Sequence, residues 1–289
     1  MGVGTLIVGS EALATGSVTR NDLRRRYVKL HRNVYARRGV ELTALDRAKA
    51  AWLWSNREGV LVGSSAAALL GTKWLSADEP AEIGRVRYPS PPGIIVRSGT
   101  IADDEVCSVG EIRCTTPART AYDIGRRIRL LEPAVVRLDA VLNATRISTE
   151  AVEAIASRYA GARGIRGLRA ALDLVDGGAE SPQETRLRLL LVLSGLPRPS
   201  TQIPVCNEFG RVVRRIDMGW PQWMVGVEYD GEQHFANPDD YAEDIERLEF
   251  LAARGWTIVR VSSCQLRWER TAIVARVRRA LDASRDYGR

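Results

Sequence analysis

The sequence has 289 residues, of which 45% are hydrophobic and 27% are charged, as in an ordinary globular protein of about two domains. No apolar run approaches the roughly 18 uncharged residues of a membrane span, and the N-terminus lacks the basic start of a secretory signal, so we expect a cytoplasmic protein without a membrane partner. The net charge of +7 favours a polyanionic partner such as nucleic acid.

The first segment, residues 1–40, is predicted to be a winged helix-turn-helix that binds DNA. Thr19–Asp22 has the pattern of a helix N-cap, and two alternating runs, 27–30 and 34–37, flank a polar turn as in a hairpin. The stretch Arg20–Arg38 carries eight basic residues and one acid. Such residues bind phosphates if they share a face, and are otherwise a solvated surface. The candidate DNA-binding residues here are Arg24, Arg25, Arg26, Lys29 and Arg32.

The second segment, residues 41–175, is predicted to be mostly helical with some strands. The runs AWLWS and SSAAALLG favour helices, because their aromatic and small side chains suit helix packing. An extended stretch over 81–100 is broken by prolines, and a helical run follows to about Val175. No catalytic constellation is evident in this segment.

The third segment, residues 180–289, begins after the helix-breaking pair Gly177 and Gly178, where Ser181-Pro182 has the pattern of a helix start. Periodicity predicts a helix, three strands, a helix, a strand and a last helix, at 182–195, 202–206, 211–218, 223–230, 239–254, 256–261 and 264–283. The order αβββαβα predicts an α/β fold for this segment, and α+β for the chain as a whole.

Three acids stand at the predicted strand ends of the third segment. Asp217 ends one β-run, and Glu228 and Asp230 end the next, where the spacing of two puts both side chains on one face. A single acid at a strand end is usually only solvated. Three converging carboxylates repel one another unless a cation lies between them, and oxygen ligands suit Mg²⁺ or Mn²⁺. The pattern therefore predicts a metal site at Asp217, Glu228 and Asp230.

Several marks in this segment occur in a fixed order: Ser181-Pro182-x-Glu184, Arg215-x-Asp217, Val227-Glu228-x-Asp230-Gly231-x-x-His234, Asp244-x-x-Arg247 and Gly255-Trp256-x-x-x-Arg260-Val261. With them the last third of the chain resembles the very-short-patch-repair-like endonucleases of the PD-(D/E)XK superfamily. The resemblance implies a restriction-endonuclease-like core, an αβββαβ arrangement, and metal-dependent cleavage of DNA.

The resemblance also implies roles for individual residues. It makes Asp217 the central metal ligand and Glu228 the second acid. Asp230 stands where the superfamily pattern has lysine, and the chain has no lysine after Lys73. The group that activates water is then open, and His234 is the candidate, because imidazole transfers protons near neutral pH. The alternative for His234 is a packing or surface role.

Two further residues have a structural and a functional interpretation. Glu184 follows Ser181 by three residues, which is a capping-box spacing, while the resemblance makes it an accessory acid of the active site. Arg247 follows Asp244 by three residues on a predicted helix, so the two side chains can pair. In a functional role, Arg247 would bind a phosphate or orient Asp230.

The first two segments resemble the winged-helix domain and following domain of AbiEi-type antitoxins. The marks are Val28-x-Leu30-His31-Arg32-Asn33-Val34-Tyr35 and Thr115-Thr116-Pro117-Ala118-Arg119-Thr120-Ala121-x-Asp123. The resemblance implies DNA binding and a role in phage defence or a toxin–antitoxin-like system.

Two functions follow as hypotheses. The first is a metal-dependent DNA endonuclease that hydrolyses phosphodiester bonds, holds DNA with its N-terminal region, and acts in phage defence or DNA repair. The alternative is an antitoxin-like DNA-binding transcriptional regulator whose nuclease domain is catalytically degenerate. The sequence leaves open whether the protein forms a homodimer or has a toxin–antitoxin-like partner.

Overall fold

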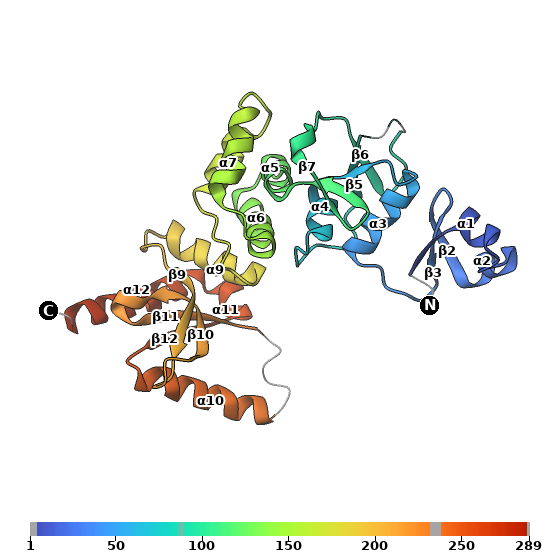
Figure 1. Ribbon diagram of the computed structural model, residues 1–289. Coiled ribbons are helices and arrows are strands. Elements are labelled where there is room, and N and C mark those ends of the chain that lie inside the picture. The colour runs from blue at the N-terminus through green and yellow to red at the C-terminus, as the bar shows by residue number, and fades with distance from the viewer. Residues whose placement is uncertain (1–4, 86, 88, 232–237, 288–289) are drawn as a thin grey trace. The chain divides into compact units, whose positions relative to one another are not determined.

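The computed structural model describes residues 5–85, 87, 89–231 and 238–287, and the side chains among these except those of 238–244 and 285–287. Helices and strands are mixed along the chain, as the predicted α/β class requires (Figure 1). The chain divides into unit 1, Met1–Asp173, and unit 2, Leu174–Arg289. No helix in the described ranges is long and apolar enough to cross a membrane.

Unit 1 begins with a small sheet and two short helices. The strands β1 (Leu6–Val8), β2 (Tyr27–His31) and β3 (Val34–Arg37) pair in the order β1-β3-β2, with the helices α1 (Gly9–Ala14) and α2 (Arg20–Arg26) between β1 and β2. The predicted hairpin is thus confirmed, while β1 was not expected. Helix α2 begins with a full capping box, in which the Asp22 N–H and the Thr19 hydroxyl lie 3.1 Å apart.

A five-stranded sheet forms the middle of unit 1, in the order β6-β5-β4-β8-β7. Its strands are β4 (Val60–Leu61), β5 (Ala81–Gly84), β6 (Ile94–Arg97), β7 (Val106–Val109) and β8 (Ile112–Thr115). Helices α3 (Ala44–Trp54) and α4 (Gly63–Leu69) pack on it through small side chains such as Ala48 and Ala66. The predicted helical run is four helices: α5 (Pro117–Arg127), α6 (Leu131–Thr145), α7 (Thr149–Arg158) and α8 (Ile165–Leu172).

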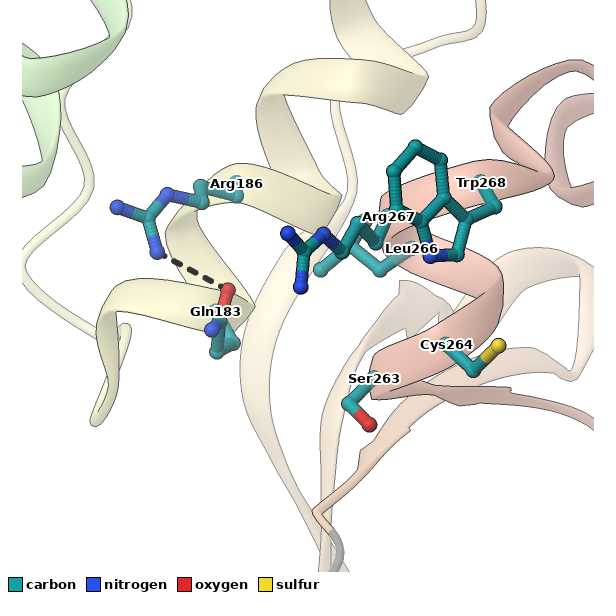
Figure 2. A pocket seen from close by; sticks show the side chains of 7 residues that line it. All are labelled: Gln183, Arg186, Ser263, Cys264, Leu266, Arg267 and Trp268. Atoms are coloured by element: carbon teal, nitrogen blue, oxygen red, sulfur yellow. Dashed lines mark hydrogen bonds between the residues drawn. The ribbon is translucent and has the colours of Figure 1, made fainter.

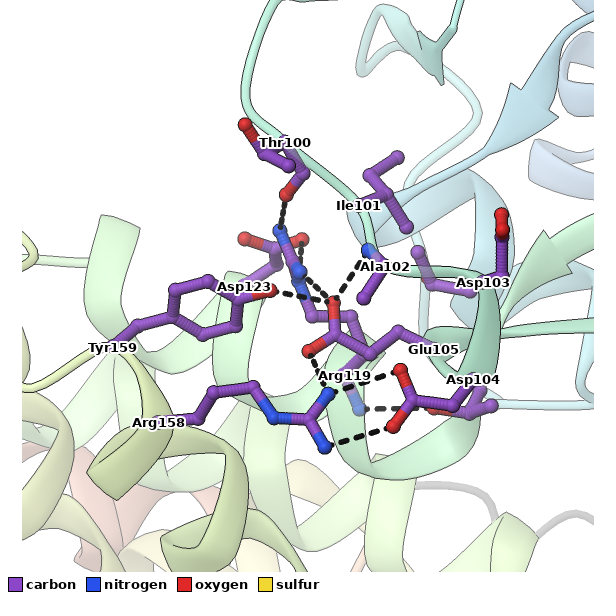
Figure 3. A network of polar contacts seen from close by, with 12 residues as sticks. Thr100, Ile101, Ala102, Asp103, Asp104, Glu105, Arg119, Asp123, Arg158 and Tyr159 are labelled. Carbon is purple, nitrogen blue, oxygen red and sulfur yellow. Dashed lines mark hydrogen bonds and ion pairs between the residues drawn. The ribbon is translucent and has the colours of Figure 1, made fainter.

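A buried network of charges joins the residue just before β7 to the helices α5 and α7 of unit 1 (Figure 3). Arg119 on α5 is 4% exposed and binds the carboxylates of Glu105 and Asp123, the latter at 3.1 Å. Arg158 at the end of α7 and the Tyr159 hydroxyl also reach Glu105, at 3.0 and 3.1 Å. These buried charges are therefore paired with one another inside the unit.

Unit 2 has one four-stranded sheet, in the order β12-β11-β10-β9. Strands β9 (Ser200–Cys206), β10 (Val212–Trp220) and β11 (Val225–Asp230) are antiparallel neighbours, and β12 (Thr257–Ser262) runs parallel to β11. The helices are α9 (Pro182–Leu193), α10 (Pro238–Ala253), α11 (Ser263–Trp268) and α12 (Arg270–Tyr287). The predicted order of elements is confirmed, except that the predicted last helix is broken at Glu269 into α11 and α12.

Helices cover both faces of this sheet. On one face, Leu187 and Leu191 of α9 and Val277 of α12 pack with Met218 and Val227 in one apolar cluster. On the other face, a second cluster joins the buried side chains of β9 and β10 to α10 and the turn after it, through Ile203, Val205, Ile216, Leu251 and Trp256. The central strands β10 and β11 are thereby fixed between two helical layers, and so are the acids that they carry.

Candidate functional site

Asp217 lies beside the peptide that joins Glu228 to Tyr229. Strands β10 and β11 are antiparallel, with Met218 opposite Val227. Asp217 and Glu228 are therefore the next residues beyond that pair, one on each strand and at the same end. The Asp217 carboxylate accepts the Tyr229 N–H at 2.8 Å. Two of the three predicted acids are therefore carried by adjacent strands at one point of the sheet.

Glu184, on the first turn of α9, belongs to the same end of unit 2. Burial raises the pKa of the Glu184 carboxyl above its ordinary value, and the negative charge of Asp217 raises the pKa further. The capping bond is present, since the Ser181 hydroxyl accepts the Glu184 N–H at 3.2 Å. The Glu184 side chain, however, accepts the N–H of Glu180 at 2.9 Å, so Glu184 both supports the helix start and lies within the field of Asp217.

Glu228 is 4% exposed and is paired with a cation. Arg247 of α10 donates to its carboxylate at 2.6 Å. The prediction that Arg247 orients Asp230 is therefore wrong, because Arg247 binds Glu228, whereas Asp230 is bound by Arg260. The predicted pairing of Arg247 with Asp244 cannot be followed, because the Asp244 side chain lies outside the described residues.

Asp230 forms an ion pair with Arg260 of the neighbouring strand β12. The parallel register places Arg260 opposite Glu228 and Ser262 opposite Asp230, so Arg260 reaches the acid diagonally across the two strands. The Arg260 side chain is 29% exposed, and that of Asp230 is 16% exposed. Asp230 therefore has a fixed positive charge beside it, and its position does not depend on a bound ion.

A ready-made metal site is not seen in the parts of unit 2 whose side chains are described. In those parts no group of three His, Cys, Asp or Glu side chains lies close enough to hold an ion. His234, the predicted proton-transfer group, lies outside the described residues. The structure thus places Asp217 and Glu228 on adjacent strands, puts Glu184 within the electrostatic field of Asp217, and pairs Asp230 with Arg260.

Gln202 belongs to this region and was not predicted. Its side-chain amide donates to Glu184 at 3.3 Å, and its backbone is in the left-handed region, with φ of 50°. A left-handed non-glycine residue costs free energy and is often found at functional sites. A glutamine inside a strand-like run carries no signal for this role in the sequence.

A basic concave surface lies in the N-terminal part of unit 1. A pocket of about 800 Å³ is lined by two tyrosines, two leucines and four cations, which are Tyr27, Tyr35, Leu13, Leu23, Arg20, Arg24, Lys29 and Arg38. The lining contains no acid, so this surface, which we call the basic pocket, has the charge that a phosphate backbone requires.

The predicted DNA-binding residues divide into two groups. Arg24 and Lys29 line the basic pocket, whereas Arg25, Arg26 and Arg32 are exposed and do not line it. Arg26 pairs with Asp22 at 3.6 Å on the surface of α2. The alternative of a merely solvated charge therefore fits Arg26 better than it fits Arg24 or Lys29.

Comparison with known proteins assigns the chain to a family. Two proteins of Mycobacterium tuberculosis, the uncharacterized protein MT2308 of strain CDC 1551 / Oshkosh and the uncharacterized protein Rv2248 of strain ATCC 25618 / H37Rv, are each 32% identical to it over 235 residues. The similarity covers 79% of this chain and 86% of each relative. This chain belongs to the Rv2248 family. No family model matches the sequence.

The similarity to Rv2248 is longer than either unit of the structure, so it includes residues of both.

Proposed function

We propose that the protein is a metal-dependent DNA endonuclease. Unit 2 supplies the hydrolytic site around Asp217, and the basic pocket of unit 1 binds the DNA backbone. The restriction-endonuclease-like resemblance of unit 2 and the antitoxin-like resemblance of unit 1 both point to DNA as the substrate. We place the protein in the cytoplasm, where phage defence and DNA repair are the two roles compatible with such an activity.

The observation that carries the proposal is the closeness of Glu184 to Asp217, with Glu228 on the strand that pairs beside Asp217. They come from a helix and two strands, and the charge of Asp217 raises the pKa of the Glu184 carboxyl. Like charges kept this close oppose folding, and a bound cation relieves the repulsion. Active sites are where such arrangements are most often found.

The acids present fit a hard divalent ion, either Mg²⁺ or Mn²⁺. Mg²⁺ is usually held by only one or two carboxylates, together with waters and substrate phosphate oxygens, so it needs no three-acid cluster. Asp217 and Glu228 would hold it, with Glu184 as the accessory acid. Glu228 and Asp230 are each already paired with an arginine, so a bound ion would have to take the place of Arg247 or Arg260 at these two acids. A bound ion of this kind lowers the pKa of water and neutralises charge on a phosphodiester.

The arginines of the site have roles that do not depend on the ion. Arg247 is 32% exposed and bridges α10 to Glu228, so it can move from the carboxylate to a DNA phosphate when the acid binds a cation. His234 follows Asp230 by four residues and is the proposed proton-transfer group, since no lysine stands in this segment.

Plasmid cleavage tests the proposal. The purified full chain is incubated with supercoiled plasmid in EDTA, Mg²⁺ or Mn²⁺, beside an Asp217→Ala variant prepared in the same way. We expect nicked or linear product only with a divalent ion and only with the wild type. Equal cleavage by the variant would reveal a contaminating nuclease and remove the support for this site.

The second candidate is an antitoxin-like transcriptional regulator with a degenerate nuclease domain. The ion pairs Arg247–Glu228 and Arg260–Asp230 favour it, because they neutralise two of the three predicted metal ligands without any ion. A regulator would bind a specific duplex through the basic pocket and would cleave no plasmid under any metal condition. A toxin–antitoxin-like partner and a homodimer both belong with this second candidate.

A further inference from the structure

Unit 2 also has a pocket of its own, formed between two of its helices. It has a volume of about 480 Å³ and is lined by residues of α9 and α11, which are Gln183, Arg186, Ser263, Cys264, Leu266, Arg267 and Trp268 (Figure 2). This volume falls within the range of about 300–1,000 Å³ that is usual for small-molecule sites. We call it the α9–α11 pocket.

The pocket opens at the end of the sheet that carries the acids. Gln183 immediately precedes Glu184 on α9, and Ser263 immediately follows Ser262, the residue that is opposite Asp230 in the β11–β12 register. The lining therefore begins one residue from the acid Glu184 and one residue from the end of β12, the strand beside β11.

Trp268 is the most unusual side chain of the lining. It is 70% exposed, and the Arg267 guanidinium lies 4.9 Å from the centroid of its ring. A tryptophan exposed to this extent keeps a large apolar ring in water, and such rings are enriched where a partner binds. Its flat face suits a nucleobase, because bases stack on aromatic side chains whatever their sequence.

The charges of the pocket suit the phosphates on either side of that base. Arg186 and Arg267 supply two cations, and the lining contains no acid. Gln183 accepts a hydrogen bond from Arg186 at 3.1 Å, as Figure 2 shows, so Arg186 is held on the same face of α9 as Gln183. An aromatic platform flanked by cations is the arrangement by which proteins hold single strands.

We infer that the α9–α11 pocket binds one unpaired nucleotide of the DNA, with the base stacked on Trp268 and a phosphate held by Arg267 and Arg186. This inference rests on the proposed function for the choice of DNA as the ligand. It narrows the substrate class to DNA that has an unpaired or easily unpaired nucleotide beside the cleaved bond, since a base inside an intact duplex already stacks on its neighbours.

The test compares binding of a short oligo-dT strand with binding of an abasic strand of the same length. Both strands carry the same phosphates, so only the first can stack. The full chain is used in EDTA, so cleavage does not enter the measurement. We expect the wild type to bind oligo-dT more tightly than the abasic strand by roughly five- to a hundredfold, the usual range for one stacked base.

Two variants assign that preference to a residue. Trp268→Ala should remove the preference, and Trp268→Phe should keep most of it, because phenylalanine retains a ring. Trp74→Ala is the matched control, since Trp74 is also largely exposed, at 61%, but belongs to unit 1. Trp268 is so exposed that its loss should leave the fold intact. A preference that survives in Trp268→Ala would overturn the inference.

Thiol protection gives a readout without any substitution. Cys264 lines the pocket, and Cys206, on β9, is exposed and does not line it. Bound oligo-dT should slow the reaction of Cys264 with a maleimide and leave that of Cys206 unchanged, as followed by mass spectrometry. Equal labelling of Cys264 with and without oligo-dT would contradict the inference.

The two proposals fail separately. A preference for bases that depends on Trp268, in a protein that cleaves no plasmid, would support the nucleotide pocket and reject the nuclease. Metal-dependent cleavage without any preference for bases would support the nuclease and reject the pocket.

Discussion

Two clusters of acidic side chains, one in each unit, differ in how their charge is neutralised. In unit 1, Glu105 and Asp123 are each 1% exposed and share the buried Arg119, with further arginines around them. In unit 2, the site acids have a backbone N–H, partly exposed arginines, and, at Glu184, a raised pKa that reflects both burial and the charge of Asp217. The first cluster is complete within the fold, whereas the second retains repulsion that a ligand can relieve.

How completely the charge of an acidic cluster is neutralised indicates whether its acids have a structural or a functional role. A network of buried ions that neutralise one another is costly to break, and it leaves little uncompensated charge for a ligand to bind. A cluster with residual repulsion is a candidate for binding a cation. The residues Arg119 and Asp123, which the antitoxin-like resemblance drew attention to, therefore have a structural role in unit 1.

After the complete loss of cleavage expected for Asp217→Ala, the largest effect is expected at the proposed proton-transfer group. His234→Ala should reduce the rate of plasmid cleavage by about 10²–10⁴, because it removes general acid–base catalysis. Stabilisation of the protein by Mg²⁺ should remain, since the acids are unchanged. Single-turnover cleavage kinetics measure the loss, and a variant as active as the wild type would assign proton transfer to another group.

The next largest effect is expected when the buried charge network of unit 1 is broken, and it is a loss of folding stability rather than of cleavage rate. Arg119→Ala should lower the free energy of unfolding of unit 1 by about 3–5 kcal/mol, because it leaves buried carboxylates short of a cation. Urea denaturation followed by circular dichroism measures this.

A matched control is available in the same unit. Arg169→Ala removes an ion pair with Glu153 in which both side chains are well exposed, 46% and 39%, so it should cost much less stability than Arg119→Ala. Equal losses for the two variants would contradict the distinction drawn for unit 1.

The basic pocket gives a smaller effect, which is measured as salt dependence. Arg24→Gln should reduce the slope of log affinity against log salt by about 0.9, which is the loss of one phosphate contact with duplex DNA. Arg26→Gln should leave the slope nearly unchanged, because Arg26 does not line the pocket and pairs with Asp22. Fluorescence anisotropy over a salt series measures both slopes, and an identical change in the two variants would argue against the pocket.

The smallest effect concerns Glu184. Because burial and Asp217 raise the pKa of its carboxyl, ionising Glu184 costs more free energy in the folded state than in the unfolded state. Glu184→Gln should therefore melt at a higher temperature than the wild type at pH 7. The difference should shrink as the pH falls through the raised pKa, and vanish below the ordinary value of 4.5, where both states are protonated. A variant less stable than the wild type at pH 7 would mean that the helix-capping role dominates.

Local signals in the sequence predicted the elements that carry the site. The capping patterns at Thr19 and Ser181 mark true helix starts, and the strands predicted at 202–206, 211–218 and 223–230 are β9, β10 and β11. These features depend on residues a few positions apart. The break at Glu269 has no glycine or proline to announce it, so the last helix was predicted as one.

The ion pairs between residues far apart in the sequence could not be predicted from local patterns. Arg247 lies 19 residues from Glu228 and Arg260 lies 30 residues from Asp230, and only the sheet register and the position of α10 decide which acid each arginine meets. Gln202 joins the site for the same reason, through a contact with Glu184 over 18 residues. The acids were therefore predictable from their spacing, and their partners were not.

Thermal melting with and without a divalent ion tests most directly the claim that Asp217 lies at a metal site. A ligand that binds only the folded state stabilises it by about 2.7 kcal/mol at a concentration of one hundred times its dissociation constant. The wild type should melt at a higher temperature as Mg²⁺ or Mn²⁺ rises into the millimolar range, and Asp217→Ala should not respond. An unchanged melting temperature in the wild type, or the same shift in both proteins, would contradict the claim and favour the regulator.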